Sequence, residues 1–354
     1  MAPLDVTEVL RAYGRLDDGK GPVAAENLPV SPLSGGLINH TLAVGDLFIL
    51  QRLHPIFAKE VNLDIAALLP VLAQGGVPVP QIVSASNGLP YVIAQAVSPT
   101  VGQPEASPAV WRLLTRLPGE TLHRLQTPAQ AQAAGAMVAR FHTALLTCPH
   151  QFHFRRAGAH DTDLHLQKLL QALVAFPDHP LHSQVGPLAE ELAVRWAAWG
   201  QIPALPERII HGDLKVSNLL WQGDAVCGVI DLDTMARSSL DIELGDALRS
   251  WCNTGTEDDD APTFSAATFS AAMQGYLSVA GSWITPQERA AVAPGVERIC
   301  LELAMRFAGD ALREDYFGWD PSRFASRGLH NLARARNQLG LARDVAAKRA
   351  LLAG

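Results

Sequence analysis

Cysteine is scarce in this chain of 354 residues, which holds four copies, and no two of them are spaced as a Cys-x-x-Cys pair. Scattered thiols of this kind are typical of reduced, buried cysteines, and they argue against a disulfide framework or a zinc-binding cysteine set. The four residues are Cys148, Cys227, Cys252 and Cys300.

Charge is also sparse, at 18% of residues, and its balance is acidic, with a net charge of −7. A protein held on nucleic acid by phosphate contacts needs a basic surface, so no nucleic-acid partner is expected. Long charge-free apolar runs and the apolar core of a signal peptide are missing too, so no membrane partner is expected. We therefore expect a cytoplasmic protein.

Hydrophobic residues, in contrast, are plentiful at 48%, and the length exceeds that of one small domain. Residues 30–117 alternate short apolar runs with turn residues, which predicts strands with one interposed helix. From Thr127 onward apolar residues recur three and four apart, which predicts helices. The chain is thus expected to be α+β, with a small β-rich lobe over residues 1–117 and a larger α-helical lobe over 118–354.

Individual elements can be placed from local patterns. Residues 37–53 read as a β-hairpin that turns at Gly45-Asp46, and 58–76 as a helix that Pro70 should bend. Further strands are expected within 81–97 and 109–117. The clearest helical runs are 6–16, 131–146, 163–176, 286–312 and 331–354.

One polar stretch lies between two short apolar strands, "RIIHGDLKVSNLLWQGDAVCGVIDLDT", which runs from Arg208 to Thr234. Asp213 comes just after the first strand, where a carboxylate could meet a substrate hydroxyl. Asn218 offers a hard carbonyl oxygen, and Asp231 ends the second strand. A base, a neutral oxygen ligand and a carboxylate ligand are the groups that phosphoryl transfer from a nucleotide requires.

The spacing follows the catalytic loop of protein kinases, H-R-D-x-x-x-x-N, with a later metal-binding Asp. His211-Gly212-Asp213 occupies the first three positions, Asn218 keeps the register, and Asp231-Leu232-Asp233 stands where the later triplet falls. Loops rich in Asp and Asn are usually only solvated turns. Here the order, the spacing and the flanking strands all favour a catalytic loop.

On these residues the chain resembles the aminoglycoside phosphotransferase and choline kinase superfamily, which has a bilobal protein-kinase-like fold. The resemblance extends over most of the chain. The segments that carry it are "LSGGLINHTLAV", "GVPVP", "VWRLLTRLPGETL", "HGDLKVSN" and "VIDLD". Within the superfamily the chain looks closest to the N-acetylhexosamine 1-kinases, by "FILQRLH", "AHDT", "IDLDT" with "LGDALR", and "MRFAGDALREDYF" with "HNLARARNQL".

The resemblance implies ATP and Mg²⁺ as cofactors and gives the catalytic loop its roles. Asp213 would be the catalytic base, and Asn218 and Asp231 would bind Mg²⁺. Asp233 is a further candidate that could touch metal, substrate or only the local backbone. Two other residues complete the expected catalytic set: Lys215, to neutralise the transferring phosphate, and His211, to organise the loop.

The resemblance also assigns nucleotide and acceptor binding. The residues 1–117 would bind nucleotide, with Ser34, Gly35 and Gly36 over the phosphates and the adenine near Leu114 and Arg116. Residues 118–354 would be the catalytic and substrate-binding lobe. Acceptor contacts are expected from His160, Asp161, Asp246 and Arg249, although Asp246 could instead brace the catalytic loop.

The strand lysine usual in kinases is absent. Gln51 or Arg52 takes its place, and strand alternation lets only one of them face the nucleotide. The acidic partner on the following helix is equally open, between Glu60 and Asp64.

Two tempting motifs are set aside. Residues 14–21, "GRLDDGKG", mimic a phosphate loop but follow a helix and lack its Ser or Thr. The histidines between residues 150 and 182 fit no zinc spacing and are expected to be surface or loop residues.

The sequence thus predicts an ATP-dependent kinase for a hydroxyl of a small molecule, foremost the anomeric hydroxyl of an N-acetylhexosamine. An aminoglycoside, choline or another amino alcohol, and homoserine are alternative acceptors. A nucleotide-binding pseudokinase is the alternative from another class, and a protein kinase is disfavoured because no activation loop is recognisable. The choice between ATP and GTP and the oligomeric state stay open.

Overall fold

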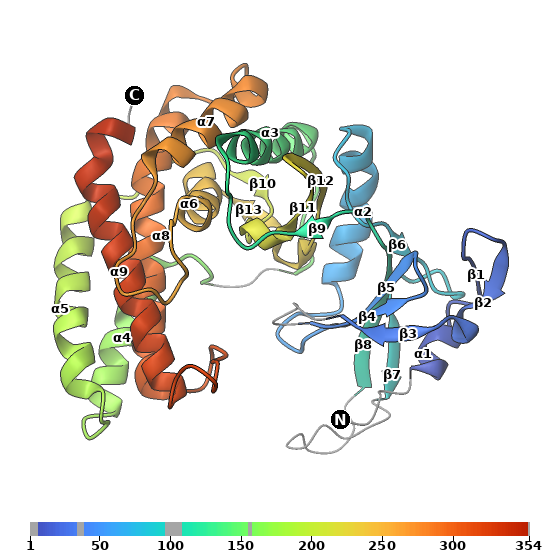
Figure 1. The fold of residues 1–354 in the computed structure, drawn as a ribbon, viewed down its shortest axis with the longest axis horizontal. Helices are drawn as coiled ribbons and strands as arrows, with labels where there is room; N and C mark the ends of the chain where they lie inside the picture. The colour runs from blue at the N-terminus through green and yellow to red at the C-terminus, as the bar shows by residue number, and fades with distance from the viewer. Residues whose placement is uncertain (1–5, 34–38, 96–107, 155–157, 353–354) are drawn as a thin grey trace. The chain divides into compact units, whose positions relative to one another are not determined.

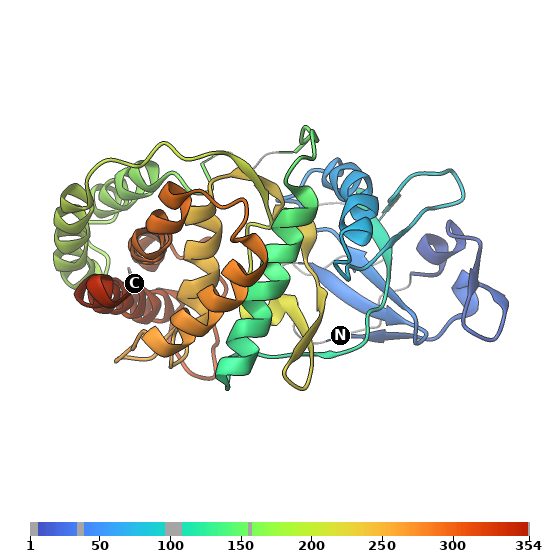
Figure 2. The same cartoon turned by 90° about the horizontal axis from the view of Figure 1, so that it is seen from above.

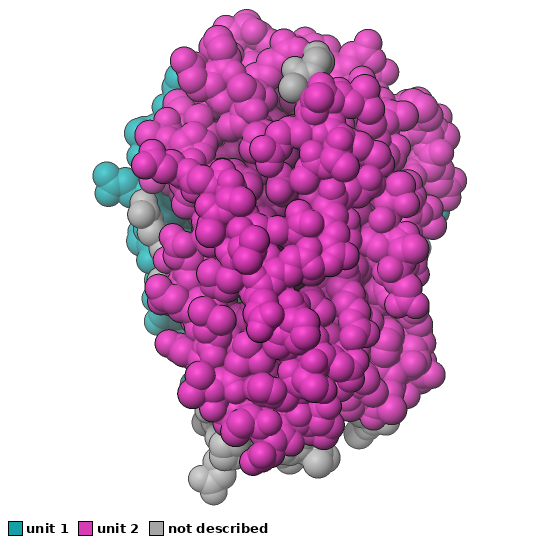
Figure 3. Space-filling model, turned by 90° about the vertical axis from the view of Figure 1, so that its left-hand side faces the viewer, with its two compact units in different colours: residues 1–120, 147–155, 227–233 teal, residues 121–146, 156–226, 234–354 magenta. Residues whose placement is uncertain are grey.

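The computed structural model describes residues 6–33, 39–95, 108–154 and 158–352. The chain forms two compact units (Figures 1 and 3). Unit 1 comprises residues 1–120 together with two later segments, 147–155 and 227–233, and unit 2 comprises the remainder. No helix among the described residues is long and apolar enough to cross a membrane.

Unit 1 is built on a six-stranded sheet of order β3-β4-β5-β8-β6, with β7 also paired to β8. The expected hairpin is confirmed, since His40 pairs with Arg52 and Val44 with Phe48. The elements of unit 1 are α1 (Thr7–Arg11), β1 (Arg15–Asp17), β2 (Pro22–Ala24), η1 (Ala25–Asn27), β3 (Val30–Pro32), β4 (His40–Val44), β5 (Phe48–Arg52), α2 (Val61–Gln74), β6 (Ile82–Val83), β7 (Val92–Gln95) and β8 (Pro108–Thr115).

The alternation of side chains along the strands of unit 1 sets what each face of the sheet carries. In β5, Phe48 and Leu50 are buried in a core that α1 also enters, through Val9 and Leu10. Gln51 points to the opposite face because successive side chains of a strand alternate. It lies directly opposite Arg112 of β8 in the antiparallel register.

Three details of unit 1 refine the expectations. The segments within 81–97 form strands that both pair with β8, so they do not form a hairpin with each other. Helix α2 continues through Pro70. Residues 14–21, set aside as a phosphate loop, lie in and around the antiparallel pair β1 and β2.

Unit 2 is mainly helical, and its longest helix, α8, packs against α4, α5, α6 and α9. The α+β fold class predicted from the sequence is confirmed. Its helices are α3 (Pro128–Leu145), α4 (Thr162–Ala175), α5 (His182–Trp199), η2 (Val216–Asn218), η3 (Leu232–Thr234, which begins in unit 1), α6 (Leu240–Trp251), α7 (Ala266–Ala280), α8 (Pro286–Arg313) and α9 (Arg327–Leu352). Figure 3 looks onto the face of unit 2 to which α4, α5 and α9 contribute.

Short strands carry the catalytic-loop stretch. Strand β10 (Arg208–Ile210) pairs antiparallel with β13 (Ala236–Ser238). A three-stranded sheet has the order β12-β11-β9, formed by β9 (Glu120–Thr121), β11 (Leu219–Gln222) and β12 (Ala225–Val229).

Helices α3 and α7 lie side by side at very short range (Figure 2). A Cβ atom on Gly275 would overlap the carbonyl oxygen of Gln132, and a Cβ on Gly135 would overlap that of Ala272. Glycine is therefore required on both helices, because any side chain would push the two backbones apart.

We predict that Gly275→Ala lowers the free energy of unfolding by about 1–3 kcal/mol, as expected for overpacking at a tight contact. Urea denaturation followed by circular dichroism measures the change. Gln274→Ala, at an exposed position of the same helix, is the matched control and should change stability by less than about 0.5 kcal/mol. Equal stability of the Gly275→Ala protein and the wild type would contradict the close approach.

Candidate active site

The loop after β10 is held in a conformation that only glycine fits at its second residue. Gly212 has a φ of +81°, and a Cβ there would lie 2.6 Å from the carbonyl oxygen of Thr234. The Thr234 hydroxyl donates to the carbonyl oxygen of His211 at 2.8 Å. The close approach explains why Gly212 stands where the protein-kinase loop has arginine.

A buried carboxylate braces the same loop from helix α6. Glu243 accepts hydrogen bonds from the backbone N–H groups of His211 and Gly212, both at 2.8 Å. The His142 ring nitrogen Nε2 lies 3.1 Å from Glu243 Oε1. Burial alone would raise the pKa of Glu243, but His142 and the loop N–H groups hold that pKa below its ordinary value. The brace is therefore an ionised carboxylate.

Asp213 is the functional centre of the loop. Lys215 Nζ donates to Asp213 Oδ2 at 2.9 Å, and the Asn218 side-chain amide donates to Asp213 Oδ2 at 3.0 Å and to its backbone oxygen at 2.7 Å. Burial alone would raise the pKa of Asp213, but the Lys215 charge, His211 and Asn218 bring it below its ordinary value. Asp213, Lys215 and Asn218 thus form one hydrogen-bonded group around an ionised carboxylate.

A second buried group lies within unit 1 and is centred on Arg112. Its Nη2 donates to Asp233 Oδ2 at 2.9 Å, and its Nη1 donates to Asp233 Oδ1. Nε and Nη2 donate to Gln51 Oε1 at 2.9 and 2.6 Å, and Nη1 donates to Asn62 Oδ1 at 3.4 Å. Asn39 donates to Asp233 Oδ2 at 2.6 Å. All five N–H groups of this guanidinium therefore have acceptors.

This group shows which of Gln51 and Arg52 lies on the same side as helix α2, and which residue of that helix meets the buried cation. Gln51, not Arg52, faces helix α2, and it binds Arg112. On α2 the residue that meets the cation is Asn62, while Asp64 binds His150 and His153. Glu60 lies at the N-cap of α2 and is partly buried. Beside the strand position where protein kinases have a lysine, the buried cation of this chain is thus Arg112, which is held by Gln51, Asn62 and Asp233.

Asp231 has an unusual backbone. Its φ is +65°, and among described residues it shares a positive φ with one other non-glycine residue, Glu314. An L-residue in this left-handed region costs about 1–2 kcal/mol. Such strain is typical of functional positions, where the surrounding structure enforces it.

The remaining expected nucleotide residues lie along unit 1. Leu114 is partly buried on β8, opposite Ile49 and Ile82. Arg116 is exposed, and its backbone N–H donates to the Leu47 carbonyl oxygen at 2.7 Å. The expected phosphate loop, Ser34, Gly35 and Gly36, lies outside the described residues.

The expected acceptor residues lie in two groups within unit 2. Asp161 caps α4 by accepting from the Leu164 N–H at 3.0 Å, and His160 Nδ1 lies 3.1 Å from Glu302. Asp246 accepts from Arg249 at 2.9 Å. The brace considered for Asp246 is made instead by Glu243, which lies three residues earlier on α6.

Sequence reasoning missed Arg112, Asn62 and Glu243. Arg112 did leave a signal, because it interrupts the apolar run "AVWRLLTRL" and a charge buried in a strand needs a partner. Glu243 left a weaker one, as an acid three residues before Asp246 on the same helix.

The braced loop with its carboxylate, lysine and asparagine is the arrangement of a kinase-like phosphotransferase. Residues 29–281 match the model of the Phosphotransferase enzyme family, and the chain belongs to this family.

Three proteins illustrate the similarity of this chain to others in sequence and in fold. A homoserine kinase of Methylobacillus flagellatus is 26% identical over 332 residues, which cover 90% of this chain and 92% of that protein. The structure of a microcompartment-associated aminopropanol kinase aligns with a TM-score of 0.61 at 19% identity, over 98% of this chain and 99% of that one. An amicoumacin kinase in complex with AMP-PNP and Ca²⁺ aligns with a TM-score of 0.58 at 16% identity, over 88% of this chain and 87% of that one.

We predict that Arg112→Met lowers the free energy of unfolding by roughly 3–5 kcal/mol, because it leaves the Asp233 carboxylate buried without a counter-charge. The double variant Arg112→Met/Asp233→Asn should recover part of that loss, since it removes both charges. Urea denaturation of both variants and of Asp233→Asn completes a double-mutant cycle. Strictly additive effects would contradict the direct ion pair.

Glu243→Gln should lower stability at pH 7 by about 1–3 kcal/mol, because two loop N–H groups lose an ionised acceptor. The folded-state pKa of Glu243 lies below its ordinary value of 4.5, so its stabilisation is present above that pH and disappears as the pH falls through the folded-state pKa.

Urea denaturation between pH 7 and about pH 3 tests this dependence. The difference between wild type and Glu243→Gln should shrink toward the acid end. Glu191→Gln, in the middle of α5, removes the partner of two partly exposed ion pairs, with Arg195 and Arg343, and should cost at most about 1 kcal/mol at pH 7. A Glu243→Gln difference that grows on acidification would contradict an ionised brace.

Proposed function

We propose that the protein transfers the γ-phosphoryl group of ATP to a hydroxyl group of a small polar molecule. The observation that carries this proposal is the Asp213 carboxylate, which is ionised and oriented by Lys215 and Asn218 in a loop fixed by Glu243. An ionised carboxylate so placed can orient an acceptor hydroxyl and accept its proton while the hydroxyl oxygen bonds to phosphorus and the bond to ADP breaks.

Asn218 and Asp231 are proposed as the ligands of Mg²⁺, on their order in the chain and on their donor chemistry. Amide and carboxylate oxygens are the hard ligands that Mg²⁺ prefers. Asn218 directs its amide nitrogen to Asp213, which leaves its carbonyl oxygen as the end available to a cation. When bound, Mg²⁺ would neutralise charge on the phosphate oxygens.

The other catalytic-loop residues are given supporting roles. Lys215, which pairs with Asp213 in this structure, would neutralise the transferring phosphate. His211 accepts from the Asp213 N–H at 3.3 Å and is proposed to organise the loop. Asp233 has Arg112 and Asn39 on its two oxygens, so we propose that it anchors the chain two residues after Asp231.

Nucleotide binding is proposed for unit 1, with Ser34–Gly36 over the phosphates and the adenine near Leu114 and Arg116. The amicoumacin kinase solved with AMP-PNP supports a nucleotide for this fold. Because every donor of Arg112 is already used, phosphate charge would be met by Mg²⁺ and backbone N–H groups rather than by Arg112 or the neutral Gln51. Arg52 points to the face of β5 opposite to that of Gln51 and is not proposed to bind phosphate.

For the acceptor we propose foremost an N-acetylhexosamine, phosphorylated at its anomeric hydroxyl. Two of the segments that carry this resemblance contact each other in unit 2, since Asp310 of "MRFAGDAL" accepts from Asn331 of "HNLARARNQL". His160 and Thr162 of "AHDT" both contact Glu302, which lies on α8 three residues before the first of these segments. Asp246 and Arg249 of "LGDALR" form a separate pair that we propose contributes to acceptor binding.

The second candidate acceptor is an amino alcohol or a hydroxy amino acid. It is favoured by the names of the similar proteins, a homoserine kinase over 90% of the chain and an aminopropanol kinase with the same fold. Such acceptors carry an ammonium group, which an N-acetylated sugar lacks, so one panel of substrates separates the two candidates.

We expect ADP release from MgATP in the presence of one acceptor class from a panel of N-acetylglucosamine, N-acetylgalactosamine, homoserine, 1-amino-2-propanol, choline and kanamycin. Asp213→Ala should lower the rate by at least about 100-fold, because the general base is removed. Because the pKa of Asp213 lies below its ordinary value, Asp213 stays ionised above about pH 5. Protonation of this residue should therefore not lower the wild-type rate above that pH.

Asp178→Ala, at an exposed loop position, is the matched control and should retain full activity. Turnover with an amine-bearing acceptor alone would keep the mechanism and replace the leading acceptor. ATP binding without turnover on any acceptor would contradict the kinase proposal and favour a pseudokinase.

A further inference from the structure

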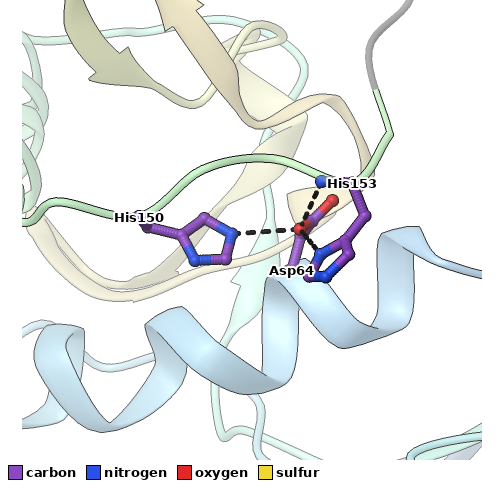
Figure 4. A group of neighbouring side chains, drawn as sticks. All are labelled: Asp64, His150 and His153. Atoms are coloured by element: carbon purple, nitrogen blue, oxygen red, sulfur yellow. Dashed lines mark hydrogen bonds and ion pairs between the residues drawn. The ribbon is translucent and has the colours of Figure 1, made fainter.

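Three metal-ligating side chains from distant parts of the sequence meet in unit 1. Asp64 lies on α2, and His150 and His153 lie on the segment 147–155 that returns to this unit (Figure 4). Asp64 Oδ1 is 3.0 Å from His150 Nε2 and 2.7 Å from His153 Nδ1, and the three ligand atoms lie within 4.8 Å of one another. Both imidazole rings point at the same carboxylate oxygen.

The carboxylate of Asp64 is buried, and the cluster is open to solvent on the side of His153. The side chain of Asp64 is 2% exposed, that of His150 is 12% exposed, and that of His153 is 53% exposed. Burial alone would raise the pKa of Asp64, but the N–H groups and imidazoles around it bring that pKa below its ordinary value, so the carboxylate is ionised. A cation could therefore reach it past His153.

The carboxylate is held independently of the two imidazoles. The backbone N–H of His153 donates to Asp64 Oδ1 at 2.9 Å, and that of Phe154 donates to Oδ2 at 3.1 Å. Hydrogen bonds of this kind orient a ligand carboxylate in protein metal sites. They can persist if an ion replaces the two imidazole contacts.

We propose that Asp64, His150 and His153 form a binding site for a divalent transition-metal ion of the zinc type. Two imidazole nitrogens and one carboxylate oxygen are a ligand set that suits Zn²⁺ better than Mg²⁺. With metal–ligand distances of about 2.0–2.1 Å, a tetrahedral ion separates its ligand atoms by about 3.3 Å. The Asp64–His150 and Asp64–His153 separations of 3.0 and 2.7 Å would therefore have to widen by about 0.3 and 0.6 Å to admit it.

Binding would also set the imidazole tautomers. The nitrogens that face Asp64 must be unprotonated to bind the ion, so His150 would carry its proton on Nδ1 and His153 on Nε2. Three protein ligands leave a fourth position for water. The ion would tie the returning segment 147–155 to α2.

This site is separate from the proposed catalytic metal by its chemistry as well as by its residues. Asn218 and Asp231 offer only oxygen atoms, whereas the Asp64 site offers mainly nitrogen. The spacing of His150 and His153 alone fits no zinc motif, because the third ligand lies 86 residues before His150.

The test is equilibrium dialysis of the chelator-treated, full-length protein against Zn²⁺, without nucleotide or acceptor. We expect one Zn²⁺ per chain in the wild type, at least about 10-fold weaker binding in His153→Ala, and a larger loss in His150→Ala/His153→Ala. His123→Ala removes an exposed histidine elsewhere and should bind as the wild type does.

Two further readouts report on geometry and folding. Co²⁺ in place of Zn²⁺ should give the visible absorption of a tetrahedral ion in the wild type and not in His153→Ala. Zn²⁺ should raise the melting temperature of the wild type, raise that of His153→Ala less, and raise that of His150→Ala/His153→Ala least. Because His153 is half exposed, its replacement should fold, which circular dichroism verifies, and His153→Gln provides a second variant that retains hydrogen bonding.

Absence of stoichiometric Zn²⁺ uptake, or equal uptake by the wild type and the double histidine variant, would overturn the proposal. The cluster would then be a hydrogen-bonded anchor only. Neither result depends on kinase turnover, so this proposal and the proposed function fail separately.

Discussion

The buried ion pair between Arg112 and Asp233 is the constraint on which unit 1 depends. A guanidinium that is almost fully removed from water is tolerable only when each donor is satisfied, and Gln51, Asn62 and Asp233 together achieve this. These partners come from strand β5, helix α2 and the returning segment 227–233. One side chain thus connects the sheet, its covering helix and the stretch that carries Asp231. The charge of Arg112 is thus neutralised within unit 1 by Asp233.

In unit 2 the corresponding constraint is Glu243. Its carboxylate fixes the two backbone N–H groups that precede Asp213, while the short distance from Gly212 to Thr234 fixes the turn itself. Asp213 can then be oriented by its neighbours Lys215 and Asn218. Preorganisation of this kind matters for phosphoryl transfer, in which positioning and charge stabilisation supply most of the catalysis.

Local patterns were sufficient to predict the α+β class, the hairpin of β4 and β5, and the candidate loop from His211 to Asn218, because each depends on residues close in sequence. They could not predict the partners of Arg112 or of Asp64. Asp233 is separated from Arg112 by 121 residues, and His150 from Asp64 by 86. Such pairs form only after segments 147–155 and 227–233 return to unit 1, and no hydrophobic periodicity in the sequence predicts that return. The absence of the strand lysine was visible in the sequence, with Gln51 or Arg52 in its place. The partner of Gln51 was not visible, because it depends on the residue opposite in the register of β5 and β8.

Phosphorus NMR of the products tests the central claim most directly, because it identifies where the phosphoryl group goes. With wild-type protein, MgATP and the acceptor that supports ADP release, the spectrum should gain a phosphate-ester signal of that acceptor in step with ADP. The Asp213→Ala protein should give neither signal. Formation of ADP with inorganic phosphate alone would contradict the account, because it would show that the loop around Asp213 activates water rather than an acceptor hydroxyl.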